Sequence, residues 1–166
     1  MPATYEPIAT TTLGSAAATI TFSSIPNTFT DLRIVLVTVT STTNYPRLRY
    51  NSDTGTNYSL TYISGNGTTA SSSRTTTQSK IVVPQNGSTS TTIPTMFTYD
   101  IFSYAGSTNK TCLITCQTDQ NGSGAVEYDV ALWRSTAAIN AIELALDNAG
   151  NYNTGTIATL YGIKAA

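Results

Sequence analysis

The stretch YPRLRYNSDTGTNYSLTYIS, residues 45–64, decides the fold class of this chain. Its two runs of aromatic and aliphatic residues, 47–50 and 58–64, flank a turn-rich segment at 51–57. β-Branched and aromatic runs bounded by Asn, Asp, Ser and Gly are typical of strands joined by a short connection. The stretch therefore predicts two strands that pair around the loop. Its only catalytic-looking group is Asp53, which favours a protein that holds a shape over one that runs a reaction.

Composition extends the β assignment to the whole chain of 166 residues. Charged residues make up 10%, against roughly 25% in a typical soluble domain. Ser and Thr replace them at about three residues in ten, and β-branched Thr suits a pleated strand. Hydrophobic residues make up 40% and the net charge is −1, which excludes the composition of a disordered chain. We therefore expect an all-β fold of ordinary domain size.

Strand candidates recur at short intervals with turn chemistry between them, as expected of a sandwich. The segment 32–40, LRIVLVTVT, is the strongest, and its apolar residues on both faces across 34–37 predict a central or doubly covered strand. The segment 137–147 permits a helix or a strand, of which we favour the strand, and 68–79 is expected to be a surface loop. The remaining strand candidates are 5–13, 18–22, 47–50, 58–64, 80–83, 95–104, 111–117, 126–133 and 157–163.

About ten strands in one domain indicate an antiparallel β-sandwich. Jelly-roll connectivity is the leading hypothesis, and an immunoglobulin-like sandwich is the alternative. Residues 1–12, which include Pro2 and Pro7, are expected to form an extended N-terminal arm or an edge strand. Residues 13–166 are expected to form the single sandwich domain.

Catalytic chemistry has little support in this sequence. It contains no histidine, which removes the commonest general base and metal ligand. Glu127 and Asp129 share one face of a predicted strand and could approach Asp100, but we interpret them as part of a solvated face. Cys112 and Cys116 lie too far apart on one strand for a disulfide, so both are expected to be small buried side chains. We therefore predict no enzyme, no catalytic residue and no cofactor.

The loop at 51–55, NSDTG, has oxygen-bearing side chains at alternate positions and a glycine, as calcium loops do. It lacks the glutamate that completes an EF-hand loop. An Asx-type turn formed by Asp53 is therefore the favoured interpretation, and we predict no metal site.

Charge and hydropathy limit the partners. The eight Lys and Arg residues are scattered, so nucleic acid is not expected. No apolar run approaches the roughly 20 residues of a membrane-spanning helix, and the N-terminus lacks the features of a secretory signal. The tyrosines around the 51–57 loop could pack a core, anchor a subunit interface or stack on a sugar.

Four segments in order along the chain carry a family resemblance: FSSIPNTFTDL (22–32), YNSDTGTNYS (50–59) with the ISGNG that follows, and TLYGIK (159–164). Together they resemble small β-rich virion proteins of tailed bacteriophages, cyanophages among them, which are described as tail or capsid decoration proteins. The resemblance implies a structural, oligomeric component of a virus particle, and it supplies no catalytic residues. The chain has no long shaft or coiled-coil segment, which favours a compact module over a complete tail fibre.

From the resemblance we expect a capsid decoration (cement) protein in the virion, assembled in the host cytoplasm. Its expected partners are further copies of itself, in a homotrimer, and the major capsid protein or other virion proteins. The alternative is a tail-tip module that recognises host surface glycan. The residues expected at subunit contacts are Tyr5, Ile34, Leu36, Tyr45, Tyr50, Tyr58 and Tyr62.

Overall fold

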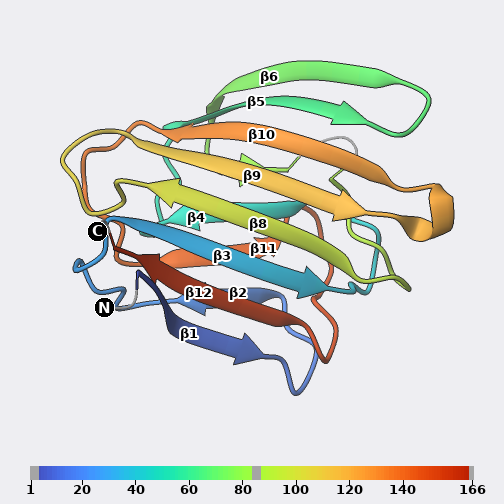
Figure 1. The fold of residues 1–166 in the computed structure, drawn as a ribbon, viewed down its shortest axis with the longest axis horizontal. Helices are drawn as coiled ribbons and strands as arrows, with labels where there is room; N and C mark the ends of the chain where they lie inside the picture. Colours follow the sequence, from blue (N-terminus) through green and yellow to red (C-terminus); the bar gives the residue numbers. More distant parts are fainter. Residues whose placement is uncertain (1–3, 84–86, 165–166) are drawn as a thin grey trace.

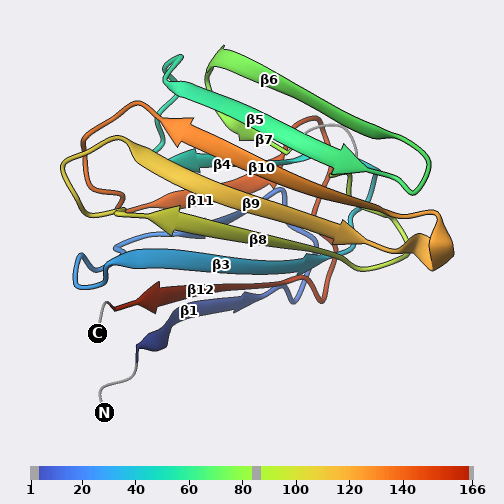
Figure 2. The same ribbon diagram turned by 45° about the horizontal axis from the view of Figure 1, so that its top comes forward.

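The computed structural model of the chain describes residues 4–83 and 87–164. These residues form an all-β sandwich of two antiparallel sheets, with one short 3-10 turn at Gln120–Gly122 (Figure 1). The large sheet has the order β1-β12-β3-β8-β9-β10-β5-β6, and the small sheet has the order β2-β11-β4-β7. Turning the molecule shows β4, β7 and β11 behind β8, β9 and β10 (Figure 2). The strands are β1 (Tyr5–Thr12), β2 (Thr19–Phe22), β3 (Asp31–Thr38), β4 (Pro46–Tyr50), β5 (Tyr58–Gly65), β6 (Ala70–Gln78), β7 (Ile81–Val82), β8 (Thr95–Phe102), β9 (Lys110–Thr118), β10 (Ala125–Trp133), β11 (Ile142–Leu146) and β12 (Ile157–Ile163).

The connectivity is that of a jelly roll, as the sequence predicted. Four antiparallel pairs are nested along the chain: β1 with β12, β2 with β11, β3 with β8, and β4 with β7. Successive pairs alternate between the large and the small sheet, so one long hairpin ribbon is rolled into two layers. The pairings of β12 with β3 and of β11 with β4 then join neighbouring turns of the roll.

Two inserted hairpins widen one layer of this roll. The pair β5–β6 follows β4, and the pair β9–β10 follows β8. All four strands join the large sheet beyond β8, so the large sheet is wider than the small sheet. The outermost strand, β6, is exposed along its whole length as a result.

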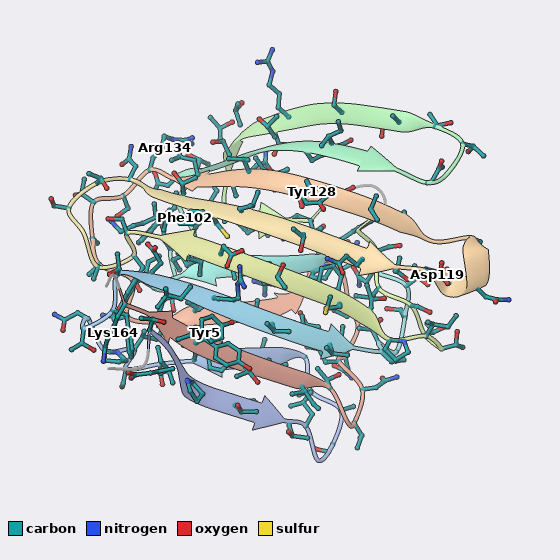
Figure 3. All side chains as sticks on the ribbon, viewed as in Figure 1. Tyr5, Phe102, Asp119, Tyr128, Arg134 and Lys164 are labelled. Carbon is teal, nitrogen blue, oxygen red and sulfur yellow. The ribbon has the colours of Figure 1, made fainter. Side chains whose placement is uncertain are left out.

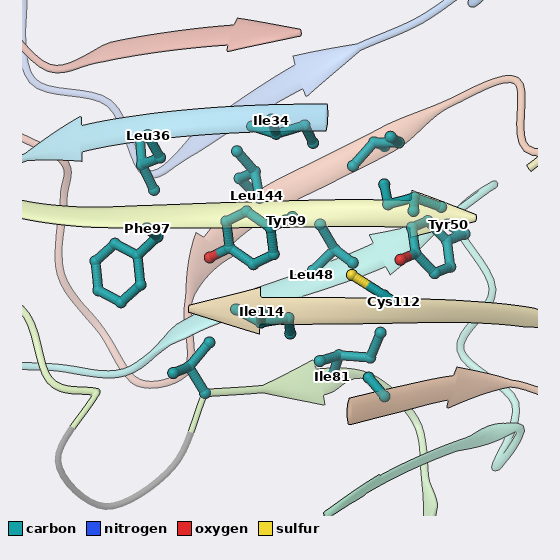
Figure 4. Packing of buried hydrophobic residues seen from close by; sticks show 14 of the residues in the cluster. Ile34, Leu36, Leu48, Tyr50, Ile81, Phe97, Tyr99, Cys112, Ile114 and Leu144 are labelled. Carbon is teal, nitrogen blue, oxygen red and sulfur yellow. The ribbon is translucent and has the colours of Figure 1, made fainter. Parts of the chain in front are cut away.

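The core fills the space between the two sheets. Alternate side chains of β3 point inward, and Leu32, Ile34 and Leu36 are fully buried. They meet inward side chains of the opposite layer, such as Leu48 and Leu144 (Figure 4). Burial of such aliphatic side chains stabilises a fold by roughly 1.5–3 kcal/mol each.

The structure corrects two expectations about strands and confirms two others. The strands β4 and β5 do not pair around the 51–57 loop, because β4 belongs to the small sheet and β5 to the large one. Residues 68–79 are not a loop, since they contain the nine-residue strand β6. The strand β3 is central, between β12 and β8, as one of the two predicted alternatives had it, and Val37 on its outer face is exposed. The ambiguous segment 137–147 contains the strand β11, in agreement with the favoured interpretation.

The N-terminal segment forms an edge strand in the structure, not a free arm. Residues 5–12 pair with β12 along the large sheet, with an irregularity between Pro7 and Ala9. Residues 1–3, with Pro2, lie outside the described residues. Cys112 and Cys116 are buried free thiols, as predicted. Among the described residues, no helix is long and apolar enough to cross a membrane.

A close backbone approach at Gly162 predicts a local intolerance of larger side chains. A Cβ atom at Gly162 would lie 2.4 Å from ring carbons of Phe29, which packs against the core. We expect Gly162→Ala to lower the free energy of unfolding by about 1–3 kcal/mol, because Phe29 must leave its place. Urea unfolding measures the change. Gly14→Ala is the control, since nothing lies within 4 Å of the place that a Cβ atom would take there, and equal stability of the two variants would contradict the expectation.

Candidate functional site

The predicted subunit-contact residues divide into a buried and an exposed group. Ile34, Leu36, Tyr50 and Tyr58 are fully buried in the core of the chain, and Tyr62 is 7% exposed. The prediction that these five meet a neighbouring subunit is wrong, because alternation in their strands turns them toward the opposite sheet. Only two of the predicted residues reach the surface, namely Tyr5, which stacks on Tyr161, and the half-buried Tyr45.

The loop that crosses between the sheets is held by Asp53. Its Oδ1 accepts a hydrogen bond from the Gly55 amide at 2.7 Å, and its Oδ2 accepts from Asn57 Nδ2 at 2.9 Å. Trp133 Nε1, at the end of β10, also donates to Oδ2 at 2.6 Å. The bond to Gly55 is the predicted Asx-type turn. The bond to Trp133 ties the loop to a strand that lies 80 residues away in the sequence.

This arrangement disfavours a cation at the loop. Both carboxylate oxygens of Asp53 already accept hydrogen bonds from N–H groups, which would oppose a cation. The bonds from Asn57, Trp133 and Gly55 hold the pKa of Asp53 below its ordinary value. Among residues 4–83 and 87–164, no group of three or more His, Cys, Asp and Glu side chains could hold a metal ion. Asp53 therefore acts as an anchor of the fold.

The two carboxylates of β10 face the interior, which corrects the expectation of a solvated face. Glu127 and Asp129 are both fully buried, opposite Ser64 and Tyr62 of β5. Neither carboxylate oxygen of Asp129 has a hydrogen-bond partner among the described residues. Burial, together with the charge of Glu127, raises the pKa of Asp129 to about 8. A side chain shut off from solvent in this way cannot meet a substrate, so the pair gives no catalytic site.

The apolar face of β10 is turned outward instead. Val126, Tyr128 and Val130 are each more than half exposed, and so is Ile63, which lies opposite Tyr128 on β5. We call these four residues the outer patch; Figure 3 shows Tyr128 on the exposed face of the large sheet. Exposed apolar side chains that lie together on one face are a feature of interaction sites. The alternation of apolar residues in 126–133 was readable from the sequence, but the side of the sheet on which they lie was not.

A groove adjoins one end of the outer patch. Its volume is about 450 Å³, and it runs between the β5–β6 turn and the β9–β10 connection. Tyr128 and Val126 form its apolar side, and Asn66, Gln117 and Asp119 supply polar groups. The groove and the outer patch together make the candidate functional surface.

Comparisons with known proteins give little for this chain. The sequence matches no protein-family model and no curated protein sequence. One solved structure, of sucrose-6-phosphate hydrolase from Lactobacillus gasseri, aligns over 90% of this chain at 14% identity with a TM-score of 0.32. The chain spans 28% of that protein's length.

We expect Asp53→Ala to destabilise the fold in a pH-dependent way. At pH 7 the loss should be about 1–3 kcal/mol, because Trp133 Nε1 loses a charged acceptor in a buried place. The folded pKa of Asp53 is depressed, so its contribution is complete above the unfolded value of about 3.9 and is lost as pH falls through the folded value. Urea unfolding at pH 7 and pH 2.5 tests both statements. Asp119→Ala, in an exposed turn, is the control, and a loss at pH 7 as small as that of the control would refute the role of Asp53.

We expect Asp129→Asn to flatten the dependence of stability on pH. The folded pKa of Asp129 is raised, so its favourable contribution is complete below about pH 4 and is lost as pH rises toward about 8. Between those limits the wild-type free energy of unfolding should fall by on the order of 2 kcal/mol more than that of the variant. Chemical unfolding from pH 4 to pH 8.5 gives the two slopes. Asp119→Asn makes the same chemical change at an exposed position and is the control, and equal slopes for wild type and Asp129→Asn would contradict the expectation.

Proposed function

We propose that this chain is a structural protein of a tailed-bacteriophage particle, a capsid decoration protein that binds the assembled shell. The observation that carries the proposal is the outer patch, formed by Ile63, Val126, Tyr128 and Val130 on the outer face of the large sheet. The sequence resemblance given above supports the same assignment.

The low net charge and the buried carboxylates favour a structural role for this protein over a catalytic one. The net charge of −1 gives weak repulsion between copies crowded on a shell. Glu127 and Asp129, which lie two residues apart on β10, are buried and unavailable to a substrate. A protein that binds only the assembled shell stabilises that shell by mass action, without any chemical step.

A tail-tip module that binds host glycan is the second candidate, and one observation favours it. The groove beside the outer patch places the ring of Tyr128 next to the polar groups of Asn66, Gln117 and Asp119. Aromatic faces beside hydrogen-bonding groups suit sugar rings. In this case binding would depend on Tyr128 but not on Val130, which does not line the groove.

We expect the double variant Tyr128→Ser/Val130→Thr to bind assembled shells at least roughly tenfold more weakly, because half-exposed apolar side chains no longer become buried. Stability should hardly change, since both side chains already face solvent. Co-sedimentation with shells of the phage that encodes the chain measures the occupancy. The matched control is Ile157→Thr on β12, which is exposed on the same face but separated from β10 by β3, β8 and β9.

Two outcomes would count against shell binding. Unchanged occupancy of the double variant would remove the outer patch from the contact. Binding to a glycan array that is lost with Tyr128→Ser alone, without binding to shells, would favour the tail module. The copy number per purified particle separates the locations, since shells carry on the order of hundreds of sites and tails far fewer.

A further inference from the structure

The strand β6 presents an open hydrogen-bonding edge. It pairs with β5 on one side only, and all nine of its residues are exposed (Figure 1). Its sequence, ASSSRTTTQ, contains no proline and a single charge, Arg74. Natural proteins usually protect such edges with proline, lysine, bulges or short strands. Apart from the single charge of Arg74, β6 has no such protection before the irregularity opposite Tyr58 and Leu60.

The other edge of the large sheet is protected by contrast. The strand β1 carries Pro7, which cannot donate to a neighbouring strand, and its ladder is irregular between Pro7 and Ala9. Glu6 on the same strand is paired with Lys164 at 3.1 Å. The two edges therefore differ in kind, and β6 is the one open to another strand.

Hydroxyl pairs across neighbouring strands recur within this molecule. Thr10 bonds Thr159 at 3.2 Å across β1 and β12, and Ser64 bonds Ser71 at 2.9 Å across β5 and β6. Thr98 and Thr115 make a third such contact across β8 and β9. Cross-strand pairs of this type stabilise a sheet by direct contact. An edge made almost entirely of Ser and Thr suits a partner strand of the same composition.

We propose that β6 pairs antiparallel with β6 of a second copy of this chain, on a two-fold axis at Ser72. This register places Ser72 opposite its symmetry mate and Ser71 opposite Ser73, so hydroxyl groups meet on both faces. It also places Arg74 opposite Ala70. A register centred on Arg74 would instead set two like charges opposite each other, which is destabilising.

The backbone groups that this pairing needs are available. The Asn66 amide donates to the Thr69 carbonyl at 3.3 Å at the end of the β5–β6 hairpin. Hydrogen-bonded and non-bonded pairs alternate in an antiparallel ladder, so the pairs 64 with 71 and 62 with 73 are bonded within the hairpin. The amides and carbonyls of Ser72 and Arg74 then point away from β5, toward the open side.

The pairing has a consequence for the outer patch. A two-fold axis perpendicular to the sheet keeps the outer faces of both copies on the same side. The two β5 strands, each with its Ile63, are then three strand spacings apart, roughly 14 Å. The two outer patches face one surface together, so the dimer would bind it with two contacts. The pairing itself does not depend on the proposed function.

Symmetric disulfide formation tests the register. We expect Ser72→Cys to give a covalent dimer under mild oxidation, because paired Cα atoms in an antiparallel ladder lie within disulfide range. Ala70→Cys is the matched control on the same edge and face. In the proposed register it lies four residues, about 13 Å, from its own symmetry mate and should stay reduced. The native Cys112 and Cys116 are buried and do not interfere.

Sedimentation of the purified protein tests the pairing without any crosslink. We expect a wild-type dimer, twice the 17.6 kDa of one chain, and a monomer for Ser72→Pro, which lacks the outward amide. Ser72→Ala keeps that amide and should remain a dimer, and unchanged far-ultraviolet circular dichroism shows that each variant is folded. A monomeric wild type, or a Ser72→Pro variant with the wild-type mass, would overturn the proposal. Shell binding plays no part in either experiment.

Discussion

The hydrogen bond from Trp133 Nε1 to Asp53 fixes the place where the chain changes sheets. At that place the chain leaves β4 in the small sheet and enters β5 in the large one. The bond also holds the end of β10, so β10 and β5 lie side by side at the register Trp133 with Tyr58. The rings of Tyr50, Tyr58 and Trp133 pack around it, with centroids 5.4 to 6.3 Å apart. The widened part of the large sheet depends on this junction, because β6 is attached through β5 alone.

In the widened part of the large sheet, β10 has carboxylates on its inner face and apolar side chains on its outer face. The small sheet ends at β7, a strand of two residues, whereas the large sheet continues beyond β8 through β9, β10, β5 and β6. In β10 the small Ala131 and the anchored Trp133 face inward, and Glu127 and Asp129 take the other inward positions. Burying Asp129 without a hydrogen-bond partner costs free energy, which is limited by its raised pKa. Val126, Tyr128 and Val130 are on the outer face, where a partner can cover them.

Local signals in the sequence were sufficient to place nearly every strand, because alternation and turn residues act over a few positions. The segment 157–163 matches β12 without error, and the Asx turn at Asp53 was readable from NSDTG. Pairing was not readable in the same way, since β4 and β5 look like a hairpin but belong to different sheets. The face of β10 was also misjudged, because alternation alone does not say which side is inside. Ser/Thr-rich β6 has neither alternation nor an apolar residue larger than alanine, so nothing local marks it as a strand.

The candidate functional surface lies on the insertions of the jelly roll. The eight strands of the roll hold much of the apolar core, and β5, β9 and β10 add to it with buried side chains such as Tyr58, Ile114 and Trp133. The four inserted strands, which are neighbours in the order β9-β10-β5-β6, carry the outer patch, the groove and the open edge. The inserted strands therefore complete the core on their inner face, and their outer face and open edge are the surface that we propose for contact with other molecules.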